Sequence, residues 1–245
     1  MRIRIVGRVK DGIIPIGYRM MIVSLLKKAI EKGDKEYFNK LYYYNEKKNK
    51  KIKSFCFGTY LQNFMFEEEG IKVDGKINIT ISTPDYMLGV SMYNGLLKLS
   101  TYKYKDKYEF IKEKVILEKE KIISDEHVVL KTLSPIVMKD SEGKKVDIDS
   151  ENYEKELNYI SNIILESYRG YGLKRKLVFI PVNMKKSVVK EEIAGFTKEI
   201  NKRYIYINGY SGIFTMEGDV EDLNLLLQLG IGFRRSEGFG LISLV

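Results

Sequence analysis

The order of apolar patterns along the chain predicts an α+β protein that contains two successive β-α-β-β-α-β units. Two observations indicate this fold class: each half combines strand-like alternation with helical spacing, and both halves follow the same order. A length of 245 residues accommodates two small domains. We place them at residues 1–122 and 123–245, because the charged segment EKEKIISDE separates the two series of patterns.

The first half contains four strand patterns, in which apolar and polar residues alternate. They lie at residues 2–9, 54–61, 77–83 and 108–119. Its helical patterns lie at residues 18–31, 35–44 and 85–97. Gly33 ends the first helix, and Asp85 is placed to open the last one.

The second half repeats this series. Its strand patterns lie at residues 128–138, 174–183, 203–216 and 238–245. Its helical patterns lie at residues 151–167 and 220–229. Asp219 is placed to cap the last helix, and the lysine-containing segment MKKSVVKEE is expected to connect the second and third strands. Each half therefore has the element order of the ferredoxin-like (RRM-like) fold.

The chain is basic and rich in aromatic residues, with a net charge of +9, 18 Tyr and 11 Phe. Because cations neutralise phosphates and aromatic rings stack on bases, this composition favours a nucleic-acid partner, although basic proteins without one are also common. One cysteine and one histidine argue against a disulfide framework and a zinc site of the usual ligand types. No apolar run approaches the roughly 20 residues of a membrane span. We therefore expect a cytoplasmic protein without a cofactor or metal.

The most distinctive segment is a glycine-rich loop at residues 229–241, between the last helix and the last strand. It contains Gly230, Gly232, Gly238 and Gly240 on either side of Phe233, Arg234, Arg235 and Ser236. It lacks the Gly-Lys-Ser/Thr of a Walker loop and the third glycine of the dinucleotide fingerprint. Glycine lets the backbone approach a ligand closely, so exposed amides and two arginines predict a phosphate cradle. The alternative is a glycine-rich turn packed against its own sheet.

With a helix before it and a strand after it, this loop resembles the signature of the CRISPR repeat-processing endoribonucleases, the family called CRISPR-associated protein six within the RAMP superfamily. The segment TLSPI at 132–136 resembles the Leu-Ser-Pro strand of that family. The LLKKAI run after Pro15 and the segment KSFCFGTYL are similar to its first helix and to its Lys-x-Phe-Thr-Phe-Ser strand. The resemblance covers essentially the whole chain. It implies two ferredoxin-like domains and CRISPR repeat RNA, precursor and guide, as the partner, with other Cas subunits as further candidates.

The resemblance also implies a reaction without metal, in which the 2′-hydroxyl beside the scissile bond attacks the phosphorus and a 2′,3′-cyclic phosphate is left. The family usually employs a histidine after the first helix; the best-aligned position here holds Tyr42, with Tyr43 and Tyr44 as alternatives in register. Lys27 replaces a tyrosine of the family's helix, and Lys53 matches its lysine before the Phe-x-Phe strand. A tyrosine with a pKa near ~10 is a poor base but can act as a donor or acid. Alternatively, the tyrosines pack on the sheet and Lys53 is a solvated surface residue.

Further basic residues are candidates for contacts with RNA. Besides the residues of the glycine-rich loop, these are Lys174, Arg175 and Lys176 at the opening of a strand, and Lys185 and Lys186 on the connection that follows. We expect RNA to occupy a groove between the domains, flanked by Lys47, Lys48, Lys50 and Lys51. The alternative for each of these residues is a solvated surface side chain.

The single histidine, His127, lies far from the family's catalytic position and is predicted to be a surface residue at a strand edge. The sequence as a whole predicts an endoribonuclease that makes guide RNAs from a CRISPR transcript. The missing histidine favours the alternative of a relative that binds the repeat without cutting it. A structural subunit of a CRISPR ribonucleoprotein is a third interpretation.

Overall fold

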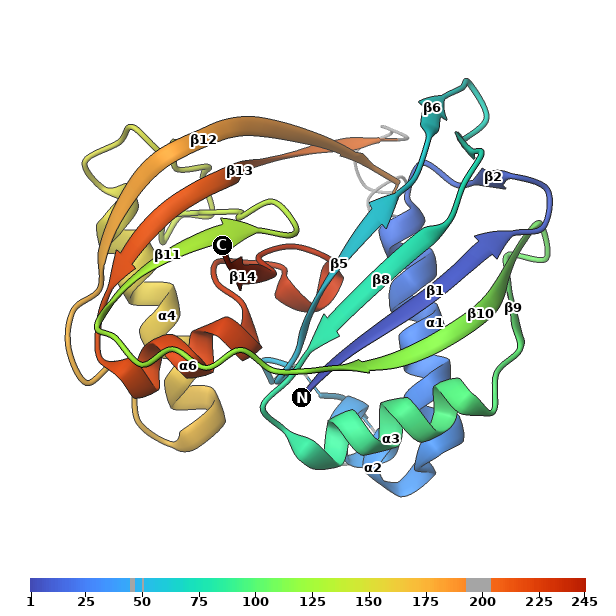
Figure 1. Ribbon diagram of the computed structural model, residues 1–245, viewed down its shortest axis with the longest axis horizontal. Helices are drawn as coiled ribbons and strands as arrows, with labels where there is room; N and C mark the ends of the chain where they lie inside the picture. Colours follow the sequence, from blue (N-terminus) through green and yellow to red (C-terminus); the bar gives the residue numbers. More distant parts are fainter. Residues whose placement is uncertain (45–46, 50, 193–203) are drawn as a thin grey trace.

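Two antiparallel sheets, one in each half of the chain, organise the protein (Figure 1). The computed structural model describes residues 1–44, 47–49, 51–192 and 204–245. The sheets lie side by side, and helices pack against one face of each (Figure 1). The predicted α+β class with two successive units is confirmed.

The first sheet has five strands in the order β5-β8-β1-β10-β9. Their bounds are β1 Arg2–Val9, β5 Cys56–Leu61, β8 Ile77–Ser82, β9 Thr101–Tyr104 and β10 Tyr108–Glu118. Strand β1 lies between β8 and β10 and buries alternate residues such as Ile3 and Ile5, as its pattern predicts. The edge strand β9 was not predicted. The other four strands follow the order second, third, first and fourth, which is the ferredoxin-like arrangement.

Three helices belong to the first unit, and all three agree with the predicted helical patterns. They are α1 Tyr18–Gly33, α2 Lys35–Tyr42 and α3 Tyr86–Leu97. At the start of α2 the Asp34 carboxylate accepts a hydrogen bond from the Tyr37 amide (2.9 Å), and at the start of α3 Asp85 accepts one from the Leu88 amide (3.0 Å). Each cap determines the residue at which its helix begins. Helix α2 begins close to the end of α1, and α3 begins beside β5.

Helices α1 and α3 touch through their backbones at two glycines. A Cβ atom placed on Gly95 would lie 1.7 Å from the Ala29 carbonyl oxygen, and one on Gly33 would lie 1.7 Å from the Ser91 carbonyl oxygen. Because no side chain fits there, the two helices can pack far more closely than side chains would allow. The start of α2, which immediately follows Gly33, is placed by this contact.

Short strands extend the first unit. Strands β2 Ile13–Ile14, β6 Phe64–Phe66 and β7 Ile71–Val73 form a small sheet, and β3 Tyr43–Tyr44 pairs with β4 Lys47–Lys48. Such short runs carry no periodic pattern, so the sequence did not predict them. Lys50 lies outside the described residues, as do the side chains of Tyr44 and Lys48.

The second sheet has the order β12-β13-β11-β14, which again places the strands as second, third, first and fourth. The elements are β11 His127–Thr132, α4 Tyr153–Arg169, β12 Val178–Glu191, β13 Ile205–Glu217, α6 Val220–Leu229, the 3-10 helix η1 Arg235–Glu237 and β14 Ile242–Leu244. Asp219 caps α6 by accepting from the amides of Glu221 (2.9 Å) and Asp222 (3.3 Å), as predicted. Strands β11 and β14 are shorter than their predicted patterns.

The segment MKKSVVKEE belongs to β12 and is not a connection, which corrects the expectation from the sequence. Within it Lys185 pairs with Ser211 and Lys186 with Tyr210. The ribbon of β12 and β13 arches from the second unit toward β5 and β6 (Figure 1). A register shift next to Pro181 interrupts the strand pattern, and the lysines made this part look like a loop.

Residues 119–126 connect β10 to β11. The Ile123 amide donates to Asn224 Oδ1 (2.9 Å), and the Ile123 carbonyl accepts from Asn224 Nδ2 (2.8 Å), which attaches this part of the connection to α6. Ile123 also belongs to the apolar core of the second unit. The division at residues 122 and 123 stays a prediction.

Replacing Gly95 with alanine tests the backbone contact between α1 and α3. In an open helix this change adds about 1 kcal/mol of stability, but here the Cβ atom has no space, so we expect a loss of about 2 kcal/mol or more in the free energy of unfolding. Urea denaturation measures it. Asn94→Ala, on an exposed position of the same helix, is the matched control and should leave stability nearly unchanged. A Gly95→Ala protein more stable than the parent would contradict the contact.

Candidate functional site at the junction of the two units

The glycine-rich loop of residues 230–241 joins the two units. The Gly240 amide donates to the Pro135 carbonyl (2.9 Å), and the Leu241 amide donates to Ser134 Oγ (2.9 Å). Ser134 Oγ in turn donates to the carbonyl of Phe57 in β5, at 3.4 Å. Three of the four segments that carried the family resemblance therefore meet in one place: the loop, the Leu-Ser-Pro segment and the strand β5.

The glycines of the loop are required by close packing. All four have positive φ, from 68° to 92°. A Cβ atom would lie 2.0 Å from the Ile231 carbonyl oxygen at Gly240, and 2.9 Å from Cys56 Sγ at Gly230. The four glycines are buried, and the amides of Gly230 and Gly240 donate to backbone carbonyls. The expected cradle of exposed amides is therefore corrected at these two positions, because the amides already have partners within the protein.

The two arginines of the loop differ in their environment. Arg235 is only 5% exposed and donates to the Leu229 carbonyl, which holds the loop against the end of α6. Burial lowers the pKa of Arg235 to about 10. Arg234 is half-buried and pairs with Glu237 at 3.0 Å. Arg234 is thus the more accessible cation of the loop, and the expected exposure of Arg235 is corrected.

Arg19 of α1, in the first unit, contacts both a strand of the second unit and the glycine-rich loop. Its guanidinium pairs with Glu191 of β12 at 3.1 Å and donates to the Gly238 carbonyl at 3.4 Å. The same group lies over the rings of Tyr18 (4.8 Å) and Phe239 (4.9 Å). Both partners of the ion pair are buried, and burial raises the pKa of Glu191 although Arg19 opposes this. The loop is therefore held from the side of the first unit by one buried charge pair.

Tyr42, Lys27 and Lys53 come together next to the loop. The Lys27 amine lies 5.0 Å from the centre of the Tyr42 ring, and the Lys53 amine lies 5.2 Å from it. Lys53 donates to the carbonyls of Leu41 (2.7 Å) and Asn49 (3.1 Å), so two of its three hydrogen-bonding directions are fixed. The three residues that the sequence singled out for chemistry thus form one cluster.

The protein environment changes the pKa values of Tyr42 and Lys53 in opposite directions. Burial raises the pKa of Tyr42 above its ordinary value, so its hydroxyl stays protonated at neutral pH. Burial, and then the positive charge of Lys27, lower the pKa of Lys53. The cluster therefore offers a neutral hydroxyl donor and an amine that loses its proton more readily than a free lysine.

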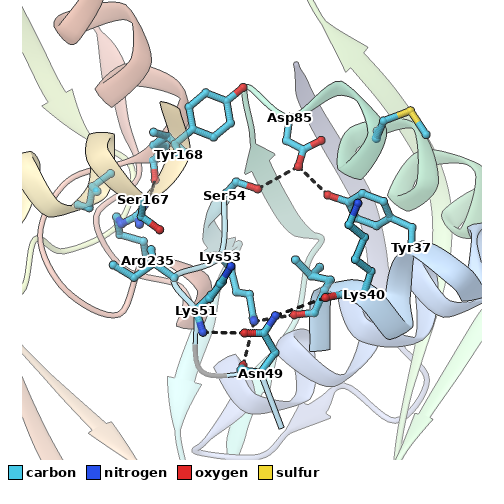
Figure 2. A pocket seen from close by; sticks show the side chains of 15 residues that line it. Tyr37, Lys40, Asn49, Lys51, Lys53, Ser54, Asp85, Ser167, Tyr168 and Arg235 are labelled. Carbon is cyan, nitrogen blue, oxygen red and sulfur yellow. Dashed lines mark hydrogen bonds between the residues drawn. The ribbon is translucent and has the colours of Figure 1, made fainter. Parts of the chain in front are cut away.

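Three cavities surround this cluster and share Asn49 and Lys53. One, of about 420 Å³, is lined by Lys27, Tyr42 and Lys53 together with Ser236 and Glu237 of the loop. The next, of about 450 Å³, lies between Asn49, Lys51 and Lys53 on one side and Arg234 and Arg235 of the loop on the other. The largest, of about 630 Å³, opens between α2, α3 and α4 (Figure 2). Together they form a continuous basic region between the two units.

The sequence profile of the family described as CRISPR associated protein Cas6, C-terminal, matches residues 117–244, which is more than half of the chain. The chain belongs to the Cas6 family. None of the curated proteins matches its sequence.

Solved structures of the Cas6 family and of RAMP proteins share the fold over the full length. A Cas6-related protein of Pyrococcus furiosus is 19% identical, with a TM-score of 0.79 and coverage of 100% of this chain and 98% of the other. A CRISPR associated protein Cas6 is 21% identical, with a TM-score of 0.73 and coverage of 100% and 99%. An RAMP protein described as binding different RNA substrates is 17% identical, with a TM-score of 0.78 and the same coverage of 100% and 99%. These likenesses support the tandem ferredoxin-like fold.

Other predicted residues lie away from the cluster of Tyr42, Lys27 and Lys53. Lys174, Arg175 and Lys176 are at the far end of α6 from the loop, where each pairs with carboxylates such as Glu221, Glu126 and Glu154. His127 begins β11 and is exposed, 3.9 Å from Glu217. The surface position predicted for His127 agrees with this placement.

Several residues of the site escaped the sequence analysis. Tyr37 donates to Asp85 at 2.6 Å and Ser54 donates to it at 3.2 Å, which forms a polar group on the wall of the largest cavity (Figure 2). Arg19 and Glu191 form the buried pair described above. Of these residues, only Asp85 was singled out from the sequence, because its position before a helix predicted a helix cap.

The described part of the chain contains neither a membrane-spanning helix nor a cluster of metal-binding side chains. None of its helices has the length and apolarity for a membrane span. No three of its His, Cys, Asp and Glu side chains come together in a way that could hold a metal ion.

Replacing Arg19 with methionine tests the buried pair. Glu191 then stays buried without its cation, and we expect a loss of about 3 kcal/mol in the free energy of unfolding at pH 7. Burial places the folded pKa of Glu191 above its unfolded value, and the variant raises it further. The folded state then binds more protons, so the loss should grow as pH rises above about 4.3 and shrink in acid.

Urea denaturation of Arg19→Met at several pH values measures this dependence. The double variant Arg19→Met with Glu191→Gln is the control, since it removes the unpaired charge and should recover part of the stability at pH 7 without the same pH dependence. An equal loss at every pH would show that the charge of Glu191 is not what the arginine compensates.

Proposed function

We propose that the chain binds CRISPR repeat RNA and cuts the precursor transcript into guide RNAs without a metal ion. The observation that carries this proposal is the cluster of Tyr42, Lys27 and Lys53 in a cavity that the glycine-rich loop completes. Membership of the Cas6 family supports it. Similar structures include an RAMP protein described as binding different RNA substrates and a Cas6 product complex, which support RNA as the partner.

The proposed reaction is an internal transfer at the phosphorus. The 2′-oxygen of the RNA forms a bond to phosphorus, and the bond from phosphorus to the 5′-oxygen breaks. The 2′-hydroxyl proton passes to a base, and the departing 5′-oxygen takes a proton from an acid. The products are a 2′,3′-cyclic phosphate and a 5′-hydroxyl, so no water and no redox partner are consumed.

Each residue of the cluster suits one part of this reaction. Lys53, with its lowered pKa, is the base that accepts the 2′-hydroxyl proton. Tyr42, whose pKa is raised, donates to the phosphate or to the 5′-oxygen. Lys27 remains a cation beside both and stabilises negative charge that develops on the phosphorus oxygens. Proton transfer is thus divided between an amine and a phenol at the place where the family usually has a histidine.

The RNA is proposed to lie along the basic region that surrounds the cluster. Lys51 and Arg234 line the cavity next to it, and Ser236 faces the cluster itself. Lysine and arginine contacts to phosphates position an RNA without reading its sequence. Contacts to Lys174, Arg175 and Lys176 require a longer RNA that reaches the far end of α6.

Repeat binding without cleavage is a second candidate function. It is favoured by one observation, the tyrosine at the position where the family usually has its histidine. A protein of this kind would use the same basic region to hold the repeat, and would lack only the proton transfer.

Incubation of the purified protein with end-labelled repeat RNA in EDTA tests cleavage. We expect one cut that persists in EDTA and disappears when the nucleotide before the cut has a 2′-deoxy sugar, because the attacking oxygen is then missing. Tyr42→Phe should slow the cut by about 100-fold, as expected for loss of an acid. Tyr159→Phe, on an exposed tyrosine that lines none of the three cavities, is the matched control. Tight binding of the repeat with no cut would leave the second candidate function.

The pH dependence of the cutting rate tests the role of Lys53. A base must be neutral, so the rate should rise with pH up to the pKa of Lys53, which is lowered in part by Lys27. Lys27→Met removes that positive charge and should displace the rise to higher pH, in addition to reducing the maximal rate. Single-turnover rates between pH 6 and about 10 give both quantities.

Lys28→Met is the control for this experiment. Lys28 is adjacent in the same helix and pairs with Glu31 (2.8 Å), away from the cluster. Its substitution should leave the profile in place. A uniform reduction by Lys27→Met, with no displacement of the profile, would mean that Lys53 is not the base.

A further inference from the structure

The largest cavity lies beside the Tyr42 cluster and has walls from both units (Figure 2). The first unit contributes Tyr37 and Lys40 of α2 and Asp85 at the start of α3. The second unit contributes Tyr168 of α4 and Arg235 of the loop. At about 630 Å³, the cavity falls in the range of small-molecule sites.

Its lining combines the surfaces that a nucleotide needs. Two aromatic rings, Tyr37 and Tyr168, can stack with a base. Basic side chains outnumber the single carboxylate, Asp85, and so favour a phosphate at the edge of the cavity. They are Lys40, Lys51 and Arg235, together with the proposed base Lys53. Leu41, Ile164 and Leu229 supply apolar surface between them.

Asp85 is held in a fixed orientation on this wall. One of its oxygens accepts from the hydroxyls of Tyr37 (2.6 Å) and Ser54 (3.2 Å), and the other accepts from the Leu88 amide (3.0 Å). A carboxylate has about four acceptor positions, so one remains open on the second oxygen. The wall therefore carries a fixed acceptor for a ligand that brings an N–H group.

The cavity adjoins the proposed catalytic cluster. Lys53 and Asn49 line both this cavity and the one that contains Tyr42. A chain whose phosphate lies at Lys27 and Lys53 would therefore bring a neighbouring nucleotide to the entrance of the larger cavity.

We infer that this cavity binds one unstacked nucleotide of the RNA, next to the scissile phosphate, with its base against Tyr168 and Asp85. The inference rests on the proposed function, since it takes RNA as the ligand. The cavity prefers a base with an exocyclic amine, which donates to Asp85. Uracil presents its single N–H between two carbonyl oxygens, and a fixed carboxylate repels both, so it is disfavoured.

The experiment measures the affinity of repeat RNAs in which each base is removed in turn, with a 2′-deoxy sugar at the cut so that the RNA stays intact. We expect one abasic position, within two nucleotides of the cut, to weaken binding to the parent protein by about tenfold or more. Tyr168→Ala should weaken binding of the complete repeat by a similar factor. In this variant, removal of the base at that position should cause little further loss of affinity. Asp85→Asn keeps a capping side chain and should reduce the preference against uracil there.

Tyr159→Ala is the matched control, because Tyr159 is an exposed tyrosine of the same helix and does not line the cavity. It should behave as the parent at every position. If Tyr168→Ala and Asp85→Asn respond to each abasic RNA as the parent does, the nucleotide site is refuted while repeat binding and cleavage stand. Equal affinity for the repeat and for an unrelated RNA would instead contradict the proposed function, and the nucleotide site with it.

Discussion

Backbone contact at the glycine-rich loop is the constraint on which the arrangement of the two units depends. The loop approaches itself so closely that a Cβ atom on Gly240 would lie 2.0 Å from the Ile231 carbonyl oxygen. On the other side, a Cβ atom on Gly58 of β5 would lie 2.9 Å from the Leu133 carbonyl oxygen. Contacts between backbones leave little freedom of position, because no flexible side chain lies between them. Ser236 of the second unit is thereby held at a fixed place beside the cluster of the first.

The cluster of Tyr42, Lys27 and Lys53 at this junction is defined by the electrostatic environment of its side chains as well as by their positions. Tyrosine and lysine have unperturbed pKa values of about 10. At neutral pH a free tyrosine is therefore a weak acid, and a free lysine is already protonated and cannot act as a base. Burial raises the pKa of Tyr42, and burial with the charge of Lys27 lowers that of Lys53. The centre of the Tyr42 ring lies 5.0 Å from the Lys27 amine and 5.2 Å from the Lys53 amine, so the ring stabilises whichever of them is charged. The lowered pKa makes the Lys53 amine easier to deprotonate, whereas the raised pKa keeps the Tyr42 hydroxyl a neutral hydrogen-bond donor and makes it a weaker acid.

The order of the elements could be predicted from the sequence, because alternation and helical spacing are local properties that persist over six or more residues. Strands of two or three residues, such as β2 and β6, have no such period. The lysines and Pro181 made half of β12 resemble a connection. The pair of Arg19 and Glu191 spans 172 positions, and neither residue lies in a motif, so no local signal could announce it. The loop was singled out from its glycines and arginines, but its burial depends on contacts with Phe57 and Val137 that only the fold brings about.

A bound RNA would bring negative charge to the proposed site and so act on the pKa of Lys53, and the positive charge of Lys27 opposes this effect. A phosphate next to Lys53 favours its charged form and, acting alone, would raise the pKa that burial has lowered. Lys27 carries one positive charge at a similar distance from the Tyr42 ring, and a phosphodiester carries one negative charge. At Lys53 the two fields oppose each other, while a base entering the neighbouring cavity removes water from the amine. Burial is the larger cause of the lowered pKa of Lys53 and the charge of Lys27 the smaller, so in the proposed reaction Lys27 offsets part of the effect of the phosphate on the amine that would take the proton.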